Sequence, residues 1–224
     1  MRRLGRVAYD EALDLQHTLV EARKAGEILD TLLLVEHPHV LTLGVRKRGG
    51  RANILATPDR LHELGVAVYE AGRGGDITYH GPGQLVGYPI IDLRPDRQDV
   101  HRYVRDLEEV LIRTSADFGV TAARLEGLSG AWVAHPSRGP EKIAAIGVRI
   151  SRWVTSHGFA FNVNTDLEFF RLIVPCGIPD RGVTSLQVQT GAPVAIERVE
   201  ASIAQHFAGV FSRELLSHAE RVLS

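Results

Sequence analysis

Cysteine and lysine are both scarce in this chain of 224 residues. Cys176 is the only cysteine, which excludes an internal disulfide and suits a reducing compartment. Lysine occurs only at positions 24, 47 and 142, so each lysine can be considered by itself.

Strong net charge and long apolar runs are absent as well. The formal net charge is -1, so the overall charge gives no indication of a nucleic-acid partner. No run approaches the about 20 apolar residues of a membrane-spanning helix, and no apolar stretch of a signal peptide follows the basic start. We therefore expect a cytoplasmic protein that binds neither nucleic acid nor membrane, with enough apolar residues (44%) for a sizeable core.

What the chain has is a glycine-rich segment, RGGDITYHGPGQLVGYPI, at residues 73–90. Glycine adopts positive φ angles and lets a ligand approach the backbone closely. Its spacing in GPGQLVG is wrong for a dinucleotide-binding fingerprint, and a strand containing Pro89 follows where a helix should begin. The segment is either a long surface loop or a backbone wall against which a substrate lies.

Apolar periodicity predicts an α/β fold. Helices are expected at residues 10–26, 99–119 and 195–223, with short helices after Thr57 and Asp166. Strands are expected at 31–37, 39–45, 66–72, 85–93, 130–135, 142–150 and 153–164. Because the strands occur in runs and also alternate with helices, we expect a mixed β-sheet flanked by helices, with residues 1–224 as a single domain.

Two residues are candidates for chemistry. Cys176 lies between two prolines in IVPCGIP, where Gly177 leaves room around the sulfur, although a buried cysteine is commonly just a small apolar side chain. Lys142 opens the apolar strand KIAAIGVRI, although a lysine at a strand end can simply extend into solvent. His37 and His39 lack a second pair of ligands, so we expect no metal site.

In order along the chain, RGGDITYHGPGQLVGYPI, KIAAIGVRI, HGFAFNVN and IVPCGI resemble the lipoyl(octanoyl) transferases, over about residues 32–186. That family is similar in fold to lipoate and biotin protein ligases. The resemblance implies octanoyl transfer from octanoyl-acyl carrier protein to an acceptor lysine, with no cofactor. The implied acceptors are the lipoyl domains of 2-oxoacid dehydrogenase complexes and the glycine cleavage H protein.

The resemblance also implies roles for individual residues. Cys176 would form the acyl thioester and Lys142 would activate it. The implied substrate-binding residues are Arg73, Gly74, Gly75, Asp76, Ile77, Thr78, Tyr79, His80, Ala145, Ile146, Gly147, Gly158, Phe159 and Ala160. His80 has two open interpretations: it orients the thioester carbonyl or relays a proton, or it is a packed, hydrogen-bonded loop histidine.

Elementary energetics are compatible with this chemistry. A thiol titrates near pH ~8.5, and an ammonium about 4 Å away favours the thiolate by up to about 4 kcal/mol before desolvation is subtracted. Burying the octanoyl chain contributes roughly 5 kcal/mol at ~0.8 kcal/mol per methylene. The alternatives are an ATP-dependent lipoate or biotin ligase, a Cys-His thioesterase and a non-catalytic acyl-binding module.

Overall fold

The computed structural model describes residues 1–45, 50–174 and 182–216, so Cys176 lies outside the described residues. Its strands form a seven-stranded sheet in the order β1-β2-β6-β10-β9-β8-β7 and a three-stranded sheet in the order β4-β3-β5. Parallel and antiparallel pairs occur in both sheets. The predicted mixed β-sheet flanked by helices is therefore confirmed.

The elements have the following bounds. The strands are β1 (Arg2–Arg6), β2 (Thr31–Glu36), β3 (Val40–Leu43), β4 (Ala67–Glu70), β5 (Ile77–His80), β6 (Gln84–Ile90), β7 (Ala122–Leu125), β8 (Leu128–Val133), β9 (Glu141–Ser151) and β10 (Val154–Asn162). The α-helices are α1 (Tyr9–Lys24), α2 (Pro58–Glu63), α3 (Val100–Asp117), α4 (Leu186–Thr190) and α5 (Ile196–Phe211). Two 3₁₀ segments are η1 (Gly50–Asn53) and η2 (Leu167–Leu172).

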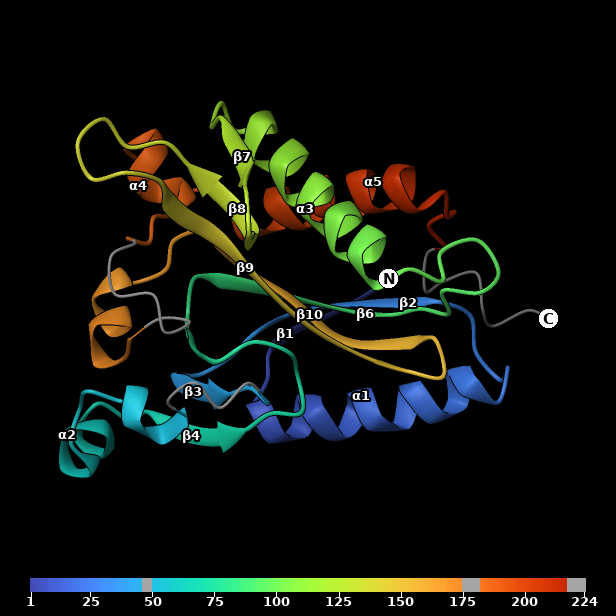
Figure 1. Ribbon diagram of the computed structural model, residues 1–224, viewed down its shortest axis with the longest axis horizontal. Coiled ribbons are helices and arrows are strands. Elements are labelled where there is room, and N and C mark those ends of the chain that lie inside the picture. The colour runs from blue at the N-terminus through green and yellow to red at the C-terminus, as the bar shows by residue number, and fades with distance from the viewer. Residues whose placement is uncertain (46–49, 175–181, 217–224) are drawn as a thin grey trace.

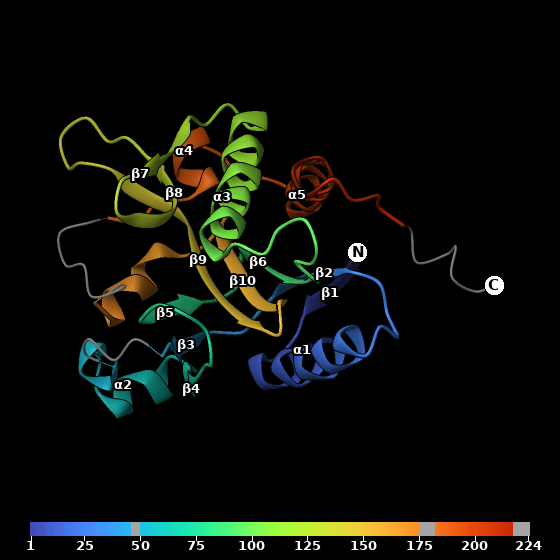
Figure 2. The same cartoon turned by 45° about the vertical axis from the view of Figure 1, so that its right-hand side comes forward.

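Helices cover both faces of the large sheet, α1 on one face and α3 with α5 on the other (Figures 1 and 2). The alternation of side chains along a strand requires this arrangement. In β2, Leu32 and Leu34 belong to the core under α3 and α5, whereas Leu33 and Val35 belong to the core under α1. A strand that is apolar on both faces must be buried on both faces.

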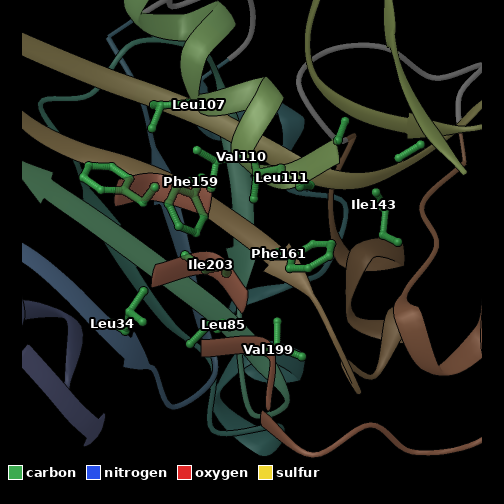
Figure 3. Close-up of a cluster of buried hydrophobic side chains, with 14 of the residues drawn as sticks. Leu34, Leu85, Leu107, Val110, Leu111, Ile143, Phe159, Phe161, Val199 and Ile203 are labelled. Atoms are coloured by element: carbon green, nitrogen blue, oxygen red, sulfur yellow. The ribbon is translucent and has the colours of Figure 1, made fainter. Parts of the chain in front are cut away.

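The larger core lies between the sheet and the pair α3 and α5 (Figure 3). Leu107, Val110 and Leu111 of α3 extend toward Phe159 and Phe161 of β10 in this core. Their spacing places these leucine and valine side chains on one face of the helix. Asp99 caps α3, because its carboxylate accepts hydrogen bonds from the backbone N–H groups of residues 101 and 102.

The small sheet has a core of its own. It is built around Leu41, Ile77, Tyr79, Phe170 and Ile173. The short helix predicted after Thr57 is α2, which joins this core through Leu61 and is capped by the Thr57 side chain. No helix within the described ranges is long and apolar enough to cross a membrane.

The described elements settle one open question and differ from the predictions in two respects. Of the two interpretations of the segment 73–90, the surface loop is excluded, because the segment contains the buried strands β5 and β6. Strands β1, β5 and β7 were not predicted. The last helix does not extend through residues 213–216, because Ser212 adopts a left-handed conformation and ends α5. The next residue, Arg213, forms an ion pair with Asp30 at 3.0 Å.

Candidate active site

A cavity of about 450 Å³ is lined by residues of both sheets. Its floor consists of neighbouring residues on three strands of the large sheet. Ala160 of β10 pairs with Val86 of β6 and with Ala145 of β9, and Gly158 pairs with Gly147. These side chains are small, so the floor leaves room for a ligand.

The opposite wall comes from the glycine-rich segment. Asp76, Thr78 and His80 line the cavity, together with the preceding Arg73 and Gly75. Ile77 and Tyr79 alternate with them and pack into the core of the small sheet. The predicted substrate residues thus separate into two groups: Gly74, Ile77 and Tyr79 do not line the cavity, and Arg73, Gly75, Asp76, Thr78, His80, Ala145, Ile146, Gly147, Gly158, Phe159 and Ala160 do.

Several glycines have a different purpose from the one that the sequence suggested. A Cβ atom at Gly147 would lie 2.9 Å from the carbonyl oxygen of Gly74, and one at Gly158 would overlap the carbonyl of Gly87. The Gly74 N–H donates to the carbonyl of Val148 at 2.9 Å. At these positions glycine lets backbone segments pack closely, and the alanines provide the space.

Lys142 lies half-buried at the start of β9 and lines the cavity. Its ammonium nitrogen Nζ is 4.6 Å from the centroid of the Trp132 ring. Its backbone N–H donates to the carbonyl of Gly182 at 2.9 Å, and its carbonyl accepts from the N–H of Thr184 at 3.0 Å. Lys142 therefore adjoins the point at which the described chain resumes after residue 181.

The predicted partner of Lys142, Cys176, belongs to residues 175–181, outside the described part of the chain. Five residues separate Cys176 from Gly182 in the sequence, so the Cα atoms of the two residues can be at most about 20 Å apart. On the other side, the N–H of Val174 donates to the carbonyl of Asn53 at 2.8 Å. The pairing of Cys176 with Lys142 stays a prediction.

A buried polar cluster adjoins the cavity. His37 Nδ1 lies 2.7 Å from the carbonyl of Val7, which can only accept, so this nitrogen donates. His37 Nε2 therefore accepts the Tyr88 hydroxyl proton at 2.8 Å. The buried Tyr9 hydroxyl lines the cavity and has no hydrogen-bond partner within the described ranges. Burial raises the pKa of Tyr9 to about 12, so its hydroxyl is a proton donor at neutral pH.

His80 is held in one tautomer. Its Nδ1 donates to Gln84 Oε1 at 2.7 Å, because the Gln84 amide nitrogen already donates to Asn162 Oδ1 at 2.9 Å. Its Nε2 is therefore an acceptor. Burial, with His37 and Arg73 nearby, lowers the pKa of His80 to about 3. His80 is both hydrogen-bonded and placed in the cavity wall, as a neutral imidazole.

His157 is the second buried histidine in the lining. Burial, with Arg73 and Arg149 nearby, lowers the pKa of His157 to about 4. Sequence reasoning did not identify seven lining residues: Tyr9, Val86, Tyr88, Gly127, Leu128, Ser129 and His157. The alternation of Val86 and Tyr88 along a strand was the one local signal available, since it puts both on the same face.

The family described as the lipoyl protein ligase A/B catalytic domain matches residues 8–208. The chain belongs to this family. It is 50% identical to an octanoyltransferase of Solibacter usitatus over 98% of this chain and 96% of that protein. It is 52% identical to an octanoyltransferase of Acidobacterium capsulatum, with 95% and 90% covered.

Solved structures share the fold. A bipartite lipoate protein ligase of Thermoplasma acidophilum superposes with a TM-score of 0.72 at 16% identity, covering 97% of this chain and 87% of that one. A biotin protein ligase of Aquifex aeolicus gives a TM-score of 0.52 at 14% identity, covering 94% and 69%. The expected likeness in fold to lipoate and biotin ligases is therefore confirmed.

Proposed function

We propose that the chain transfers an octanoyl group in protein lipoylation through a thioester on Cys176. Octanoyl transfer is supported by relatives of that name, about half identical over nearly the whole chain. One observation carries the thioester route. Lys142 lines the cavity, and its backbone binds Gly182, on the chain arm that leads to Cys176. An ammonium at this place can stabilise a thiolate.

The first half of the proposed reaction loads the enzyme. The Cys176 thiolate attacks the carbonyl carbon of the octanoyl thioester of acyl carrier protein. The bond between that carbon and the carrier sulfur breaks, and the carrier leaves as a thiolate that takes a proton from the Lys142 ammonium. Because one thioester replaces another, this step needs no energy source such as ATP.

The second half discharges the enzyme. The amine of a lipoyl-domain lysine attacks the Cys176 thioester, forms the amide and expels the Cys176 thiolate. The amine proton passes to neutral Lys142, which restores the starting thiolate and ammonium. Lys142 thus gives a proton in one half and takes one in the other, so its two protonation states act at different times.

The cavity floor suits the acyl chain in this proposal. Ala145, Ala160 and Val86 present apolar surface, and burying the octanoyl chain there contributes roughly 5 kcal/mol. We propose octanoyl-acyl carrier protein as the donor. The proposed acceptors are the lipoyl domains of 2-oxoacid dehydrogenase complexes and the glycine cleavage H protein, in the cytoplasm.

Intact-mass spectrometry tests the proposal. The protein is mixed with octanoyl-acyl carrier protein in the absence of ATP. We expect the wild-type protein to gain a single octanoyl adduct and Cys176→Ser to gain none. When a lipoyl domain is added, the octanoyl group should move from the enzyme to the lipoyl domain. Release of octanoate to water would identify a thioesterase. If the lipoyl domain is modified only when free octanoate and ATP are supplied, the protein is a ligase. If neither octanoyl-acyl carrier protein nor octanoate with ATP gives a reaction, it is an acyl-binding module.

A further inference from the structure

We propose that Trp132 is a positioning residue for Lys142: the face of its indole ring holds the lysine ammonium in place beside the cavity. This inference rests on the proposed function, because Lys142 has its catalytic part only there. Trp132 itself does not line the cavity. It acts on the reaction through the lysine.

The backbone register brings the two side chains together. Trp132 of β8 and Lys142 of β9 are cross-strand partners in an antiparallel pair. Side chains of directly opposite residues lie on the same face of a sheet and contact each other. Lys142 Nζ lies over the ring at 4.6 Å from its centroid, within the about 6 Å of a cation–π contact.

Trp132 is set apart from the apolar cores on either side of the sheet. Its neighbours Ala131 and Val133 are in the core under α3, whereas Trp132 belongs to none of the hydrophobic clusters that the structure describes. A register shift of the β8–β9 ladder occurs between Ala131 and Trp132. Such irregularities re-aim a side chain.

Hydrogen bonding does not account for an indole here. Trp132 is 3% exposed, and its Nε1 has no hydrogen-bond partner in the described part of the chain. Among the described residues, the one polar group of the ring is therefore buried without a hydrogen bond. Its aromatic face, in contrast, is in contact with the lysine.

The contact has a chemical consequence. A ring quadrupole attracts the ammonium but gives no comparable attraction to a neutral amine. The backbone of Lys142 is fixed by β8 on one side and by residues 182–184 on the other, and the indole ring contacts the ammonium at the end of its side chain. The ring therefore favours the cation, and it favours one location for that cation. This is the state that Cys176 needs at the start of the cycle.

The pH dependence of Cys176 alkylation tests this inference. Iodoacetamide reacts with the thiolate, and intact mass reports the rate without ambiguity because Cys176 is the sole cysteine. The variants are Lys142→Met as reference, Trp132→Leu, Trp132→Phe, and Trp153→Phe as the matched control at the only other tryptophan. Trp153 lies in the β9–β10 turn and packs against the core under α3.

We expect Lys142→Met to raise the midpoint pH of alkylation. Trp132→Leu should raise it by roughly 0.5 to 1 pH unit, Trp132→Phe by less, and Trp153→Phe not at all. In the pH profile of kcat/KM, Trp132→Leu should shift the acid limb to higher pH and the alkaline limb to lower pH, which narrows the profile. A purely structural role would lower the plateau without narrowing the profile.

Fluorinated tryptophan, incorporated in a Trp153→Phe background, keeps the ring size and weakens its quadrupole. It should shift the midpoint in the same direction even if Trp132→Leu folds poorly. Suppose that Lys142→Met shifts the midpoint pH of alkylation but fluorinated Trp132 leaves it at the wild-type value. This result would overturn the role of Trp132 and leave the proposed function intact. An unshifted Lys142→Met would overturn the Cys176–Lys142 pair, and the role of Trp132 with it.

Discussion

The Tyr88 hydroxyl donates to Nε2 of His37 at 2.8 Å, in a buried site where the other ring nitrogen donates to the Val7 carbonyl. The two bonds fix the imidazole of His37 in the neutral tautomer with the proton on Nδ1. They also hold the Tyr88 ring against the cavity. A residue at the end of β2 thus sets the position of a ring in the floor of the site.

Tyr88→Phe should lower the free energy of unfolding by about 1–3 kcal/mol, because a buried acceptor on His37 loses its donor. Urea unfolding measures the loss. Tyr79→Phe is the matched control: its hydroxyl bonds to His39, which is only half-buried, so water can replace the donor. Equal losses in the two variants would contradict the assigned tautomer of His37.

Stability should fall in acid because of the neutral histidines. In the unfolded chain histidine titrates near pH ~6.5, whereas the pKa is about 3 for His80 and about 4 for His157 in the folded protein. Between pH 6.5 and pH 4 the unfolded chain therefore binds more protons than the folded protein. Each of these two histidines then lowers the free energy of unfolding by about 1.4 kcal/mol for each pH unit of acidification.

Urea unfolding between pH 7 and pH 5 measures this slope. His80→Asn should make it shallower, and His62→Gln, on an exposed position of α2, is the control for removing a histidine. An unchanged slope in His80→Asn would show that His80 is protonated in the folded protein.

Lys142→Arg should separate the two proposed tasks of the lysine. Arginine keeps the positive charge, so octanoyl should still load onto Cys176, although more slowly because the head group is larger. Arginine cannot accept a proton, so the adduct should persist when a lipoyl domain is added. Single-turnover mass spectrometry follows both steps. Discharge at the wild-type rate would limit Lys142 to an electrostatic role.

Ala160→Leu should change the acyl preference by filling the floor of the cavity. Octanoyl has two methylenes more than hexanoyl, worth about 1.6 kcal/mol when fully buried, or more than tenfold in kcat/KM. If the leucine side chain fills the space of these two methylenes, the ratio of kcat/KM for the octanoyl donor to that for the hexanoyl donor should fall more than tenfold. The hexanoyl donor is the internal control for a general loss of activity, and an unchanged ratio would place the acyl chain elsewhere.

Much of the framework follows from local sequence pattern. Ala12, Leu19 and Val20 repeat at helical spacing and are buried, which is why the helix predicted at residues 10–26 exists as α1. Strand β5 was missed because Ile77 and Tyr79 alternate with polar residues inside a glycine-rich segment. That alternation is a strand signal of only four residues, too short to stand out among glycines.

The site could be predicted only in part. Three of the four family-like motifs lie in segments that line most of the cavity, and the fourth, IVPCGI, extends outside the described residues. Tyr9 begins α1 and His37 follows β2, and no local pattern relates either residue to β5 or β6. They meet only because α1 and the strands share one core face. The tautomer of His37 depends on Tyr88, 51 residues away, and that of His80 depends on the bond between Gln84 and Asn162, which are 78 residues apart, so no short sequence window contains these partners.

For protein engineering, the close contact between Gly147 and Gly74 divides the cavity lining into positions that can be varied and positions that cannot. A library at Gly147 or Gly158 would chiefly return unfolded protein, because any side chain there collides with backbone. Diversity placed at Ala145, Ala160 and Val86 would instead explore acyl size and shape on an intact scaffold. New acyl specificities in this chain should therefore arise from its alanines.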